Sequence, residues 1–413
     1  MMTNELENEP KLRFPEFNEE WEEKILDEVS TFSKGKGISK NDLSKDGTPC
    51  ILYGELYTTY DFIINKIKSK TLLDTKNLVK GKKNQVLIPS SGETPLDIAT
   101  AAVINTTEDM LLGGDINVLT PVQKYDGKFI SLSINGKNKS NLSKYAQGKS
   151  VVHLYNNDIK KLKIKFPVKN SEQRKIGDFF SKLDRQIELE EQKLEKLEEQ
   201  KKGYMQQIFS QKLRFKDDNG NYYAEWKEKN LGDISELITK GTTPKNKVND
   251  GSINFIKVEN ISPINGFITN TTKITEEEHS TYLKRSQLKE NDILFSIAGT
   301  LGRVSVVKRE ILPANTNQAL AIIRLNAMNL EYIKTYLTGR AIKRFIANNP
   351  TVGAQPNMSL TQIRDLIIAV PNLTEQEKIG SFFKKIDNSI KKQSDKIWLL
   401  KKRKKGFLQK MFV

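Results

Sequence analysis

The sequence has few of the residues that carry most metal-binding and nucleophilic chemistry. Its 413 residues include one cysteine, Cys50, and two histidines, His153 and His279. A single cysteine excludes an internal disulfide and a cysteine-rich zinc site, and it is typical of a reducing cytoplasm. Because Cys50 lies in an apolar stretch, we expect it to be a small core residue and not a reactive thiol. His153 lies among valines and a leucine, so we expect it in the core or at a sheet edge.

Catalytic motifs are missing as well. Neither HExxH nor GxSxG occurs, and Gly148-Lys149-Ser150 lacks the glycine that a phosphate-binding loop requires five positions earlier. No Asp…Glu-x-Lys set typical of a nuclease follows a predicted strand turn in either half. These absences favour a binding protein with no metal site and no catalytic residues of its own.

Long apolar runs are absent too. No stretch approaches the roughly 18 consecutive apolar residues that a membrane-spanning helix needs. The first ten residues are polar and acidic, without the basic segment that opens a secretion signal. We therefore expect a cytoplasmic protein with neither a membrane span nor a signal peptide.

The charge is strongly one-sided. Lys and Arg number 67 against 51 Asp and Glu, so the formal net charge is +16. Such an excess favours a polyanionic partner such as nucleic acid, because cations that neutralise phosphates release condensed counterions. A lysine-rich composition can also reflect the base composition of a genome, so charge alone does not decide the partner.

The chain contains one module twice. Residues 171–184 (SEQRKIGDFFSKLD) match residues 374–387 (TEQEKIGSFFKKID), and the match continues without a gap to Phe209 and Phe412. Upstream, Lys11-Leu-Arg-Phe recurs from Lys212, and further apolar positions recur in the same order. Matches in one order and one register indicate an internal duplication. The predicted organisation is a module at 11–170, a helix at 171–210, a second module at 211–373 and a second helix at 374–413.

The two modules agree in pattern more than in residues. Apolar runs predict strands at corresponding places, namely 51–56 with 255–261 and 86–88 with 293–295. A glycine follows each member of the second pair, Gly92 and Gly299. Amphipathic spacing predicts a helix at 330–347, with a weaker counterpart at 129–145 that Gly136 interrupts. Each module is therefore predicted to be a mixed α/β domain.

The two repeated helices carry a coiled-coil pattern. Apolar residues alternate three and four positions apart for more than four heptads, with Glu190, Lys201, Gln393 and Lys404 as polar interruptions that can fix the register. We predict that Ser171 and Thr374 cap the two helices. The apolar seam comprises Ile176, Phe180, Leu183, Ile187, Leu194, Leu197 and Ile208 in the first helix, and Ile379, Phe383, Ile386, Ile390, Ile397, Leu400, Phe407 and Met411 in the second.

Opposite charges favour pairing of the two helices with each other. The first is rich in Glu over 188–199 and the second is rich in Lys over 391–405, so self-pairing between molecules would bring like charges together. Chain direction makes the pair antiparallel and pseudo-twofold. At about 1.5 Å per residue, each helix is expected to span roughly 50–60 Å, a spacer that lets two modules contact DNA segments about one turn apart. Alternatively, the charged faces are merely solvated and the apolar seam alone selects the partner.

The repeated block carries a family resemblance. The pattern Ser/Thr-Glu-Gln-x-x-Ile-Gly-x-Phe-Phe…Asp, twice opening a heptad helix, resembles the conserved repeats of the specificity subunit of type I restriction-modification enzymes. The segments 240–244 (KGTTP) and 291–294 (NDIL) with Gly299, together with Asn317-Gln318, are similar to recurring loops of that family's target-recognition domains. The first half departs from this pattern at 37–39 (GIS) and 84–87 (NQVL).

The resemblance implies two target-recognition domains of mixed α/β fold, joined by a long antiparallel two-helix coiled coil, with no catalysis and no cofactor in this chain. Each domain would recognise one half of a bipartite DNA site, and the helices would set the gap and dock two methyltransferase subunits. Those partners would use S-adenosylmethionine to methylate adenine, and motor-nuclease subunits would use ATP and magnesium.

The recognition regions differ between the halves, so we expect unlike half-sites and no palindrome. No arginine occurs between Arg13 and Arg174, so the first domain must recognise bases without the common Arg-to-guanine contact. The second domain has Arg285, Arg303, Arg324, Arg340 and Arg344 for that contact. Candidate DNA contacts, chosen by loop position, are Lys34, Lys36, Lys40, Ser90, Ser91 and Thr94 in the first half and Lys240, Thr242, Thr243, Lys245, Thr300, Arg303, Asn317 and Gln318 in the second. Any of them can contact phosphate or only solvent as readily as a base edge.

Two other functions remain open at this point. A free-standing DNA-binding regulator would bind its sequence tightly without any methyltransferase. A coiled-coil scaffold that binds only proteins would have no salt-dependent affinity for DNA.

Overall fold

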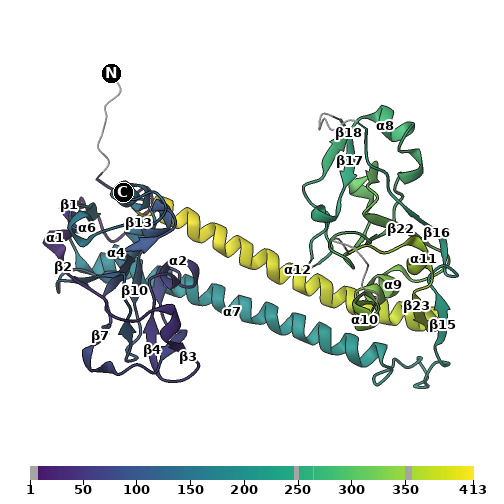
Figure 1. Ribbon diagram of the computed structural model, residues 1–413, viewed down its shortest axis with the longest axis horizontal. Helices are drawn as coiled ribbons and strands as arrows, with labels where there is room; N and C mark the ends of the chain where they lie inside the picture. The colour runs from purple at the N-terminus through teal and green to yellow at the C-terminus, as the bar shows by residue number, and fades with distance from the viewer. Residues whose placement is uncertain (1–7, 246–250, 264, 349–355) are drawn as a thin grey trace. The chain divides into compact units, whose positions relative to one another are not determined.

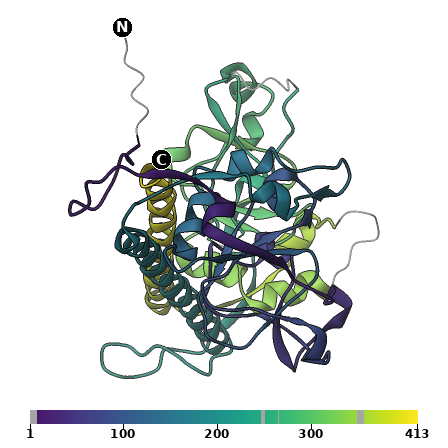
Figure 2. The ribbon, with the colours of Figure 1, turned by 90° about the vertical axis from the view of Figure 1, so that its left-hand side faces the viewer.

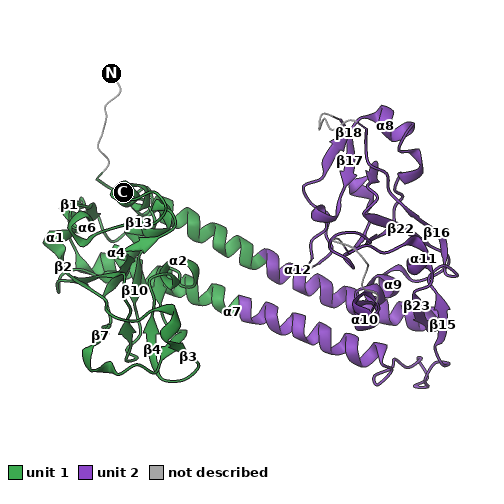
Figure 3. Ribbon diagram, in the orientation of Figure 1, with its two compact units in different colours: residues 1–190, 396–413 green, residues 191–395 purple. Residues whose placement is uncertain are grey.

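The computed structural model describes residues 8–245, 251–263, 265–348 and 356–413, so most of the acidic N-terminal segment lies outside the described residues (Figure 1). The chain divides into two compact units. Unit 1 comprises Met1–Glu190 and Lys396–Val413, and unit 2 comprises Glu191–Asp395 (Figure 3). Both boundaries fall inside the two long helices, so each unit contains part of each helix. No helix within the described ranges is long and apolar enough to cross a membrane.

Unit 1 is built on two mixed five-stranded sheets. Their strand orders are β2-β12-β8-β10-β5 and β3-β6-β4-β11-β7. The pairs β10/β5 and β11/β4 are parallel, and the other pairs are antiparallel. Two further pairs, β1 with β14 and β9 with β13, are antiparallel. The strands are β1 Glu22–Ile25, β2 Ser30–Lys34, β3 Leu43–Ser44, β4 Thr48–Ile51, β5 Ile63–Ile64, β6 Ser69–Thr71, β7 Val79–Lys80, β8 Val86–Pro89, β9 Ser91–Gly92, β10 Ala102–Ile104, β11 Leu111–Leu112, β12 Ile116–Pro121, β13 Val152–His153 and β14 Lys163–Phe166.

Short helices complete unit 1. The most buried is α4, whose side chains from Phe129 to Ile134 enter the core beside β8 and β10. It ends at Gly136, the residue expected to interrupt this helix. The helices are α1 Leu26–Val29, η1 Lys40–Asp42, α2 Glu55–Thr58, η2 Thr75–Asn77, α3 Pro95–Ile98, α4 Gly127–Asn135, α5 Lys139–Ser143 and α6 Asn156–Ile159.

Unit 2 contains a four-stranded sheet in the order β16-β22-β19-β20, a three-stranded sheet in the order β18-β17-β21, and the pair β15 with β23. The strands are β15 Lys227–Asn230, β16 Ser235–Lys240, β17 Ile253–Ile256, β18 Thr272–Ile274, β19 Ile293–Ser296, β20 Val304–Val306, β21 Ala314–Thr316, β22 Leu320–Leu325 and β23 Ile367–Val370. The shorter helices are η3 Val258–Asn260, α8 Glu276–Ser280, η4 Lys284–Ser286, η5 Arg309–Ile311, α9 Leu330–Leu337, α10 Arg340–Asn348 and α11 Leu360–Arg364.

The two units share one topology. The antiparallel run β2-β12-β8 of unit 1 corresponds to β16-β22-β19 of unit 2, and β6-β4-β11 corresponds to β18-β17-β21 with the same parallel pair. The pairs β1/β14 and β15/β23 correspond as well. The mixed α/β fold class and the shared pattern of the two modules are thus confirmed.

Two predicted strands end earlier than expected. The run 51–56 leaves the sheet after Ile51, because the Glu55 carboxylate accepts a hydrogen bond from the Leu52 amide at 2.8 Å and α2 begins. The run 255–261 leaves the sheet after Ile256, because the Asn260 side chain accepts from the Lys257 amide at 2.7 Å and η3 begins. In both places a polar side chain turns the backbone, which an apolar pattern does not reveal.

The long helices are α7 Asn170–Phe209 and α12 Leu373–Lys410. Both begin earlier than predicted, so Ser171 and Thr374 are not the caps. Asn372 caps α12, since its side chain accepts from the Glu375 amide at 2.9 Å, and Ser171 lies inside the first turn of α7. Seam residues are buried except Leu194, Leu197, Ile386 and Phe407, which are half-buried.

The α7 and α12 segments run antiparallel within each unit. In unit 1, Glu190 pairs with Lys396 at 2.8 Å and Asp184 with Lys404 at 2.6 Å. From Asp184 to Glu190 the residue numbers rise along α7, while those of their partners fall from Lys404 to Lys396 along α12. Figures 1 and 2 draw the two segments of unit 1 side by side. In unit 2, Lys201 pairs with Asp387 at 2.6 Å. Opposite charges therefore face each other across the helix pair. The Glu190–Lys396 pair follows the predicted pattern of Glu on the first helix and Lys on the second, whereas Lys201–Asp387 has the cation on α7 and the anion on α12.

Candidate nucleic-acid interface

The repeated Glu-Gln pair fastens each module to the start of its long helix. The Glu172 carboxylate accepts from Arg13 Nε at 2.7 Å and Nη2 at 2.8 Å, and the hydrogen bond raises the pKa of Arg13. In unit 2, Glu375 accepts from Arg214 Nη2 at 2.9 Å and also from Trp226 Nε1 at 3.0 Å. Both carboxylates are almost fully buried, at 1% and 0% exposure. These bonds explain why Lys-Leu-Arg-Phe recurs together with the helix block.

The following glutamine and glycine complete this attachment. Gln173 accepts from the Asp126 amide at 3.1 Å and donates to the Pro167 carbonyl at 3.1 Å. Gln376 makes the same two contacts with Asn329 and Pro371, at 3.0 and 2.9 Å. A Cβ at Gly177 would lie 2.8 Å from a Lys128 carbon, and one at Gly380 would lie 2.4 Å from Asn329 Oδ1. The long helix thus touches the start of α4 or α9 so closely that only glycine fits.

An aromatic cluster is also repeated. In unit 1, Phe412 lies between Trp21, Phe129 and Phe180, with ring centroids 5.3 to 6.5 Å away. In unit 2, Phe209 lies 5.9 Å from the rings of Tyr332 and Phe383, and Trp226 is 6.1 Å from Tyr332. The match between the halves extends to Phe209 and Phe412 because each ring fills the same place in a module core.

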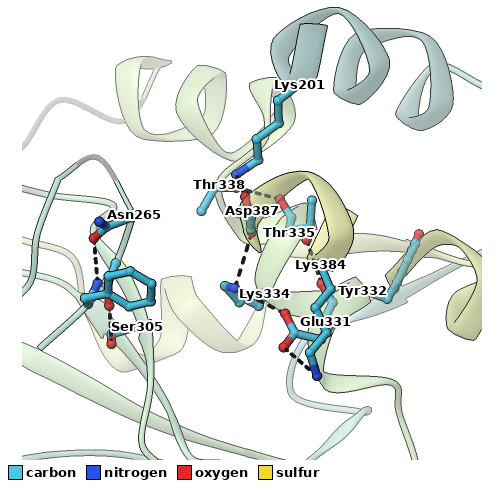
Figure 4. A network of polar contacts seen from close by, with 12 residues as sticks. Lys201, Asn265, Ser305, Glu331, Tyr332, Lys334, Thr335, Thr338, Lys384 and Asp387 are labelled. Atoms are coloured by element: carbon cyan, nitrogen blue, oxygen red, sulfur yellow. Dashed lines mark hydrogen bonds and ion pairs between the residues drawn. The ribbon is translucent and has the colours of Figure 1, made fainter. Parts of the chain in front are cut away.

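A charged network joins α9 to the helix pair of unit 2 (Figure 4). Asp387 receives Lys201 at 2.6 Å and Lys334 at 3.5 Å, and Glu331 receives Lys334 at 3.1 Å and Lys384 at 3.7 Å. Its counterpart in unit 1 joins Lys404 to Asp184 and to Asp61. Lys404 thus pairs with the module of unit 1 as well as with α7, and Lys201 shares Asp387 with Lys334 of α9.

The recognition loops predicted from the sequence come together in each unit. In unit 1, Gly35 crosses the segment between β11 and β12, and its amide donates to the Ile116 carbonyl at 2.9 Å. In unit 2, Gly241 crosses the corresponding segment and donates to Leu320 at 3.2 Å. A Cβ would lie 2.0 Å from a backbone oxygen at Gly35 and 2.1 Å from one at Gly241. Glycine is therefore required where the two loops cross.

A third loop joins each crossing. In unit 1, the Ser90 amide donates to Asp115 at 2.8 Å and the Leu154 amide donates to Ser90 at 3.0 Å. In unit 2, Ile297 and Met358 repeat these bonds, at 2.8 Å to Ala319 and 2.7 Å to Ile297. We call these groups of loops the loop clusters: residues 34–40, 90–94 and 112–115 in unit 1, and residues 240–245, 297–303 and 316–319 in unit 2.

Candidate side chains of unit 1 differ in accessibility. Lys34, Lys36, Lys40 and Thr94 are exposed. Ser90 and Ser91 are only 5% and 7% exposed, and the Ser91 hydroxyl lies 3.1 Å from His153 Nδ1. In this structure the two serines are buried supports of the loop cluster, and their contact with DNA stays a prediction. The Lys34 ammonium lies 5.7 Å from the centre of the exposed Tyr155 ring, an aromatic neighbour that the sequence did not single out.

Unit 2 brings together most of its candidates. Lys240, Thr243, Lys245, Thr300 and Gln318 are exposed, while Thr242 and Asn317 are half-buried. The Thr243 hydroxyl donates to Gln318 across the crossing loops. The Lys245 amide donates to Glu278 at 2.8 Å, and its ammonium lies 4.4 Å from the Tyr282 ring centre.

Two candidate arginines serve the fold. Arg303 donates from Nη1 to the carbonyls of Val258 and Ile261 at 3.0 and 2.9 Å. Arg324 forms a two-pronged pair with buried Asp292, at 2.8 Å for both bonds. Arg303 thus holds the loop cluster in place, and its contact with DNA stays a prediction. Arg285, Arg340 and Arg344 are exposed.

Cys50 lies in the core and His153 at a sheet edge, as the sequence predicted. Cys50 is fully buried, and burial raises the pKa of its thiol to about 11. His153 is half-buried at the edge pair β13/β9. Among the described residues, no group of three or more His, Cys, Asp or Glu side chains is arranged to hold a metal ion.

The internal repeat agrees with a known family. The family model described as "Type I restriction modification DNA specificity domain" matches residues 18–199 and again residues 223–397. The chain belongs to this family. Both matches combine one module with most of the long helix that follows it, which is the unit of the duplication.

Proteins similar to this chain are named as specificity subunits of type I restriction enzymes. The type I restriction enzyme MjaVIII specificity subunit of Methanocaldococcus jannaschii is 21% identical over 95% of this chain and 92% of its own length. A provisionally named MjaX specificity subunit of the same organism is 27% identical over 216 residues, and the match spans half of each protein. The crystal structure of a type I restriction-modification S subunit from M. genitalium covers 98% of this chain and 99% of its own, with a TM-score of 0.64 and 17% identity. That likeness supports the fold.

Proposed function

We propose that this chain is the DNA sequence-specificity subunit of a type I restriction-modification complex, and that each loop cluster recognises one half of a bipartite site. The observation that carries the proposal is the contrast within the duplication. The attachments to the long helices use corresponding Arg, Glu and Gln residues in both halves, whereas the loop clusters share only backbone geometry. Two domains that recognise different bases need the same attachment to the helices and different side chains in their loop clusters.

Catalysis is assigned to partner subunits. Methyltransferase subunits that bind S-adenosylmethionine would dock on the helices and modules, and motor-nuclease subunits would supply ATP- and magnesium-dependent cleavage. The chain itself would need no cofactor. Its task would be to position a target adenine for a partner that must move the base out of the stack.

The side chains available for base contacts differ between the clusters. Unit 1 offers exposed lysines and Thr94, and no arginine occurs between Arg13 and Arg174. The loop cluster of unit 2 offers Lys240, Lys245, Thr243 and Gln318, and Arg285 is exposed in the same unit outside the cluster. A bidentate arginine contact with guanine is therefore possible in the second half-site only.

The decisive experiment is to map N6-methyladenine in cells that express this chain with the adenine methyltransferase from the same genome. We expect one bipartite, non-palindromic motif. Substituting Lys34 and Lys36 by Gln should change methylation of one half-site, and substituting Lys240 and Lys245 by Gln should change the other. Absence of a bipartite motif, or a palindromic one, would contradict the proposal. Tight binding by the isolated chain, indifferent to the methyltransferase, would favour a free-standing regulator, and no salt-dependent DNA affinity would favour a protein scaffold.

A second experiment tests the role of the helices. Four residues inserted after Leu197, with four after Lys391 on the facing helix, add about 6 Å at ~1.5 Å per residue. We expect the gap between half-sites to lengthen by one or two base pairs, at ~3.4 Å each, with both half-sites unchanged. The matched control is a four-residue insertion at the exposed turn after Asp218, which should leave the gap as it was. A change in half-site bases would contradict this division of roles.

A further inference from the structure

One helix of unit 2 carries a basic surface that the loop clusters do not include. We propose that α10, Arg340–Asn348, binds DNA backbone phosphates beside the half-site recognised by unit 2. This inference rests on the proposed function and adds a contact that contributes affinity and orientation without base preference. The contacting side chains would be Arg340, Lys343 and Arg344.

The sequence around α10 is one-sided in charge. Residues 338–364 contain Arg340, Lys343, Arg344 and Arg364 and no Asp or Glu. In a chain with 51 acidic residues among 413, a run of this length without a carboxylate leaves the cations with no neighbour in sequence to neutralise them. Their field is therefore available to an external anion.

The fold exposes these cations on one face of α10. Arg340, Lys343 and Arg344 are exposed, while Ile342 is 2% exposed and packs into the core of unit 2. Spacings of three and four residues place the three cations on adjacent positions of the helix surface. Among the described residues, no ion pair is formed by any of the three.

This basic face is continuous with the loop cluster of unit 2. A Cβ at Gly302 would lie 2.9 Å from Ile346 Cδ1, so α10 packs directly against the turn 299–302 that presents Thr300. Gly302 has a φ of +79°, a conformation that favours glycine. The same turn is held by a bond from the Gly299 amide to the Pro356 carbonyl at 3.0 Å. A duplex that contacts Thr300 would therefore bring its backbone close to α10.

Phosphate suits this face better than a protein does. Guanidinium groups bind phosphate oxygens through two parallel hydrogen bonds. Protein interfaces are usually centred on buried aromatic or large aliphatic side chains. No exposed large hydrophobic residue lies on the described part of 338–348. The partner that this surface fits is thus the DNA backbone.

The test compares two triple variants of equal charge change in the complex with the methyltransferase. The first is R340Q/K343Q/R344Q, and the matched control is K212Q/K227Q/K229Q, which removes three exposed lysines away from the loop cluster. Binding to a duplex containing the methylated motif is measured between 50 and 300 mM salt, roughly the range in which counterion release dominates. Each lost phosphate contact lowers the salt slope by about 0.9. We expect the first variant to bind at least tenfold more weakly near ~0.1 M salt, with a slope smaller by roughly 2 to 3.

Several results would overturn the inference. If the first variant has the same affinity and salt slope as the control, α10 does not contact DNA. A changed methylation motif would make α10 a base-recognising element. Loss of methyltransferase association, measured by gel filtration of the mixed proteins, would make it a protein interface. The proposed function fails separately, if the unsubstituted complex does not prefer the duplex containing the motif.

Discussion

The attachment between Glu375 and Arg214 offers the sharpest test of how the modules are held. Replacing Glu375 by Gln keeps the shape of the side chain but removes the charge that Arg214 and Trp226 face. Glu375 is fully buried and the Arg214 side chain is 14% exposed, so the arginine is left with a poor partner. Breaking such a pair costs about 3 kcal/mol, which corresponds to a factor of roughly 150 in a local opening equilibrium.

Amide hydrogen exchange measures this loss segment by segment. We expect faster exchange in β15, β23 and the first turn of α12, with unit 1 unchanged. Glu172→Gln is the internal comparison in the other half. It should have a smaller effect, by about 1 kcal/mol, because Trp21 Nε1 makes no hydrogen bond within the described structure whereas Trp226 Nε1 donates to Glu375. Equal effects of the two variants, or acceleration spread over both units, would refute this reasoning.

Three further outcomes are expected. Lys404→Met should cost about 3 kcal/mol at pH 7. Burial raises the pKa of Asp184, so this deficit should appear only as pH rises through that raised pKa and be small below it, in urea unfolding followed at several pH values. Gly241→Ala would place a Cβ 2.1 Å from a facing carbonyl oxygen and should abolish methylation at the motif. The control Gly406→Ala, whose Cβ would meet no atom within 4 Å, should leave methylation intact. Cys50, whose pKa is near 11, should react with a thiol reagent at pH 7.5 only after unfolding. Its contribution to the free energy of unfolding should fall as pH rises from 9 to 11. Rapid labelling of the folded protein would contradict the burial of Cys50.

Much of the architecture follows from periodicity and repetition. The seam from Ile176 to Leu400 predicted two long helices, and the opposite charges of Glu190 and Lys396 predicted their pairing. Both inferences depend on spacing along one chain, which sequence records directly. The helix starts were misplaced by one or two residues because Asn372, which supplies the cap, stands just before the repeated block and not within it.

The candidate site was less accessible to sequence reasoning. Ser90, Ser91 and Arg303 were chosen by loop position, which does not tell whether a side chain points outward or bonds to backbone carbonyls. The role of Glu375 was also missed, although a signal existed. The Glu-Gln pair recurs together with Lys-Leu-Arg-Phe in both halves. This joint recurrence could have indicated that the two repeated segments contact each other.

The placement of Phe412 has a consequence for how the protein is made. Unit 2 is a single continuous stretch of chain, whereas the core of unit 1 includes Leu408, Met411 and Phe412 from the far end of the sequence. Every residue of unit 2 therefore leaves the ribosome before the residues that complete unit 1. The module translated first is therefore completed last, and in a nascent chain that has not reached residue 396 the rings of Trp21 and Phe129 lack their contact with Phe412.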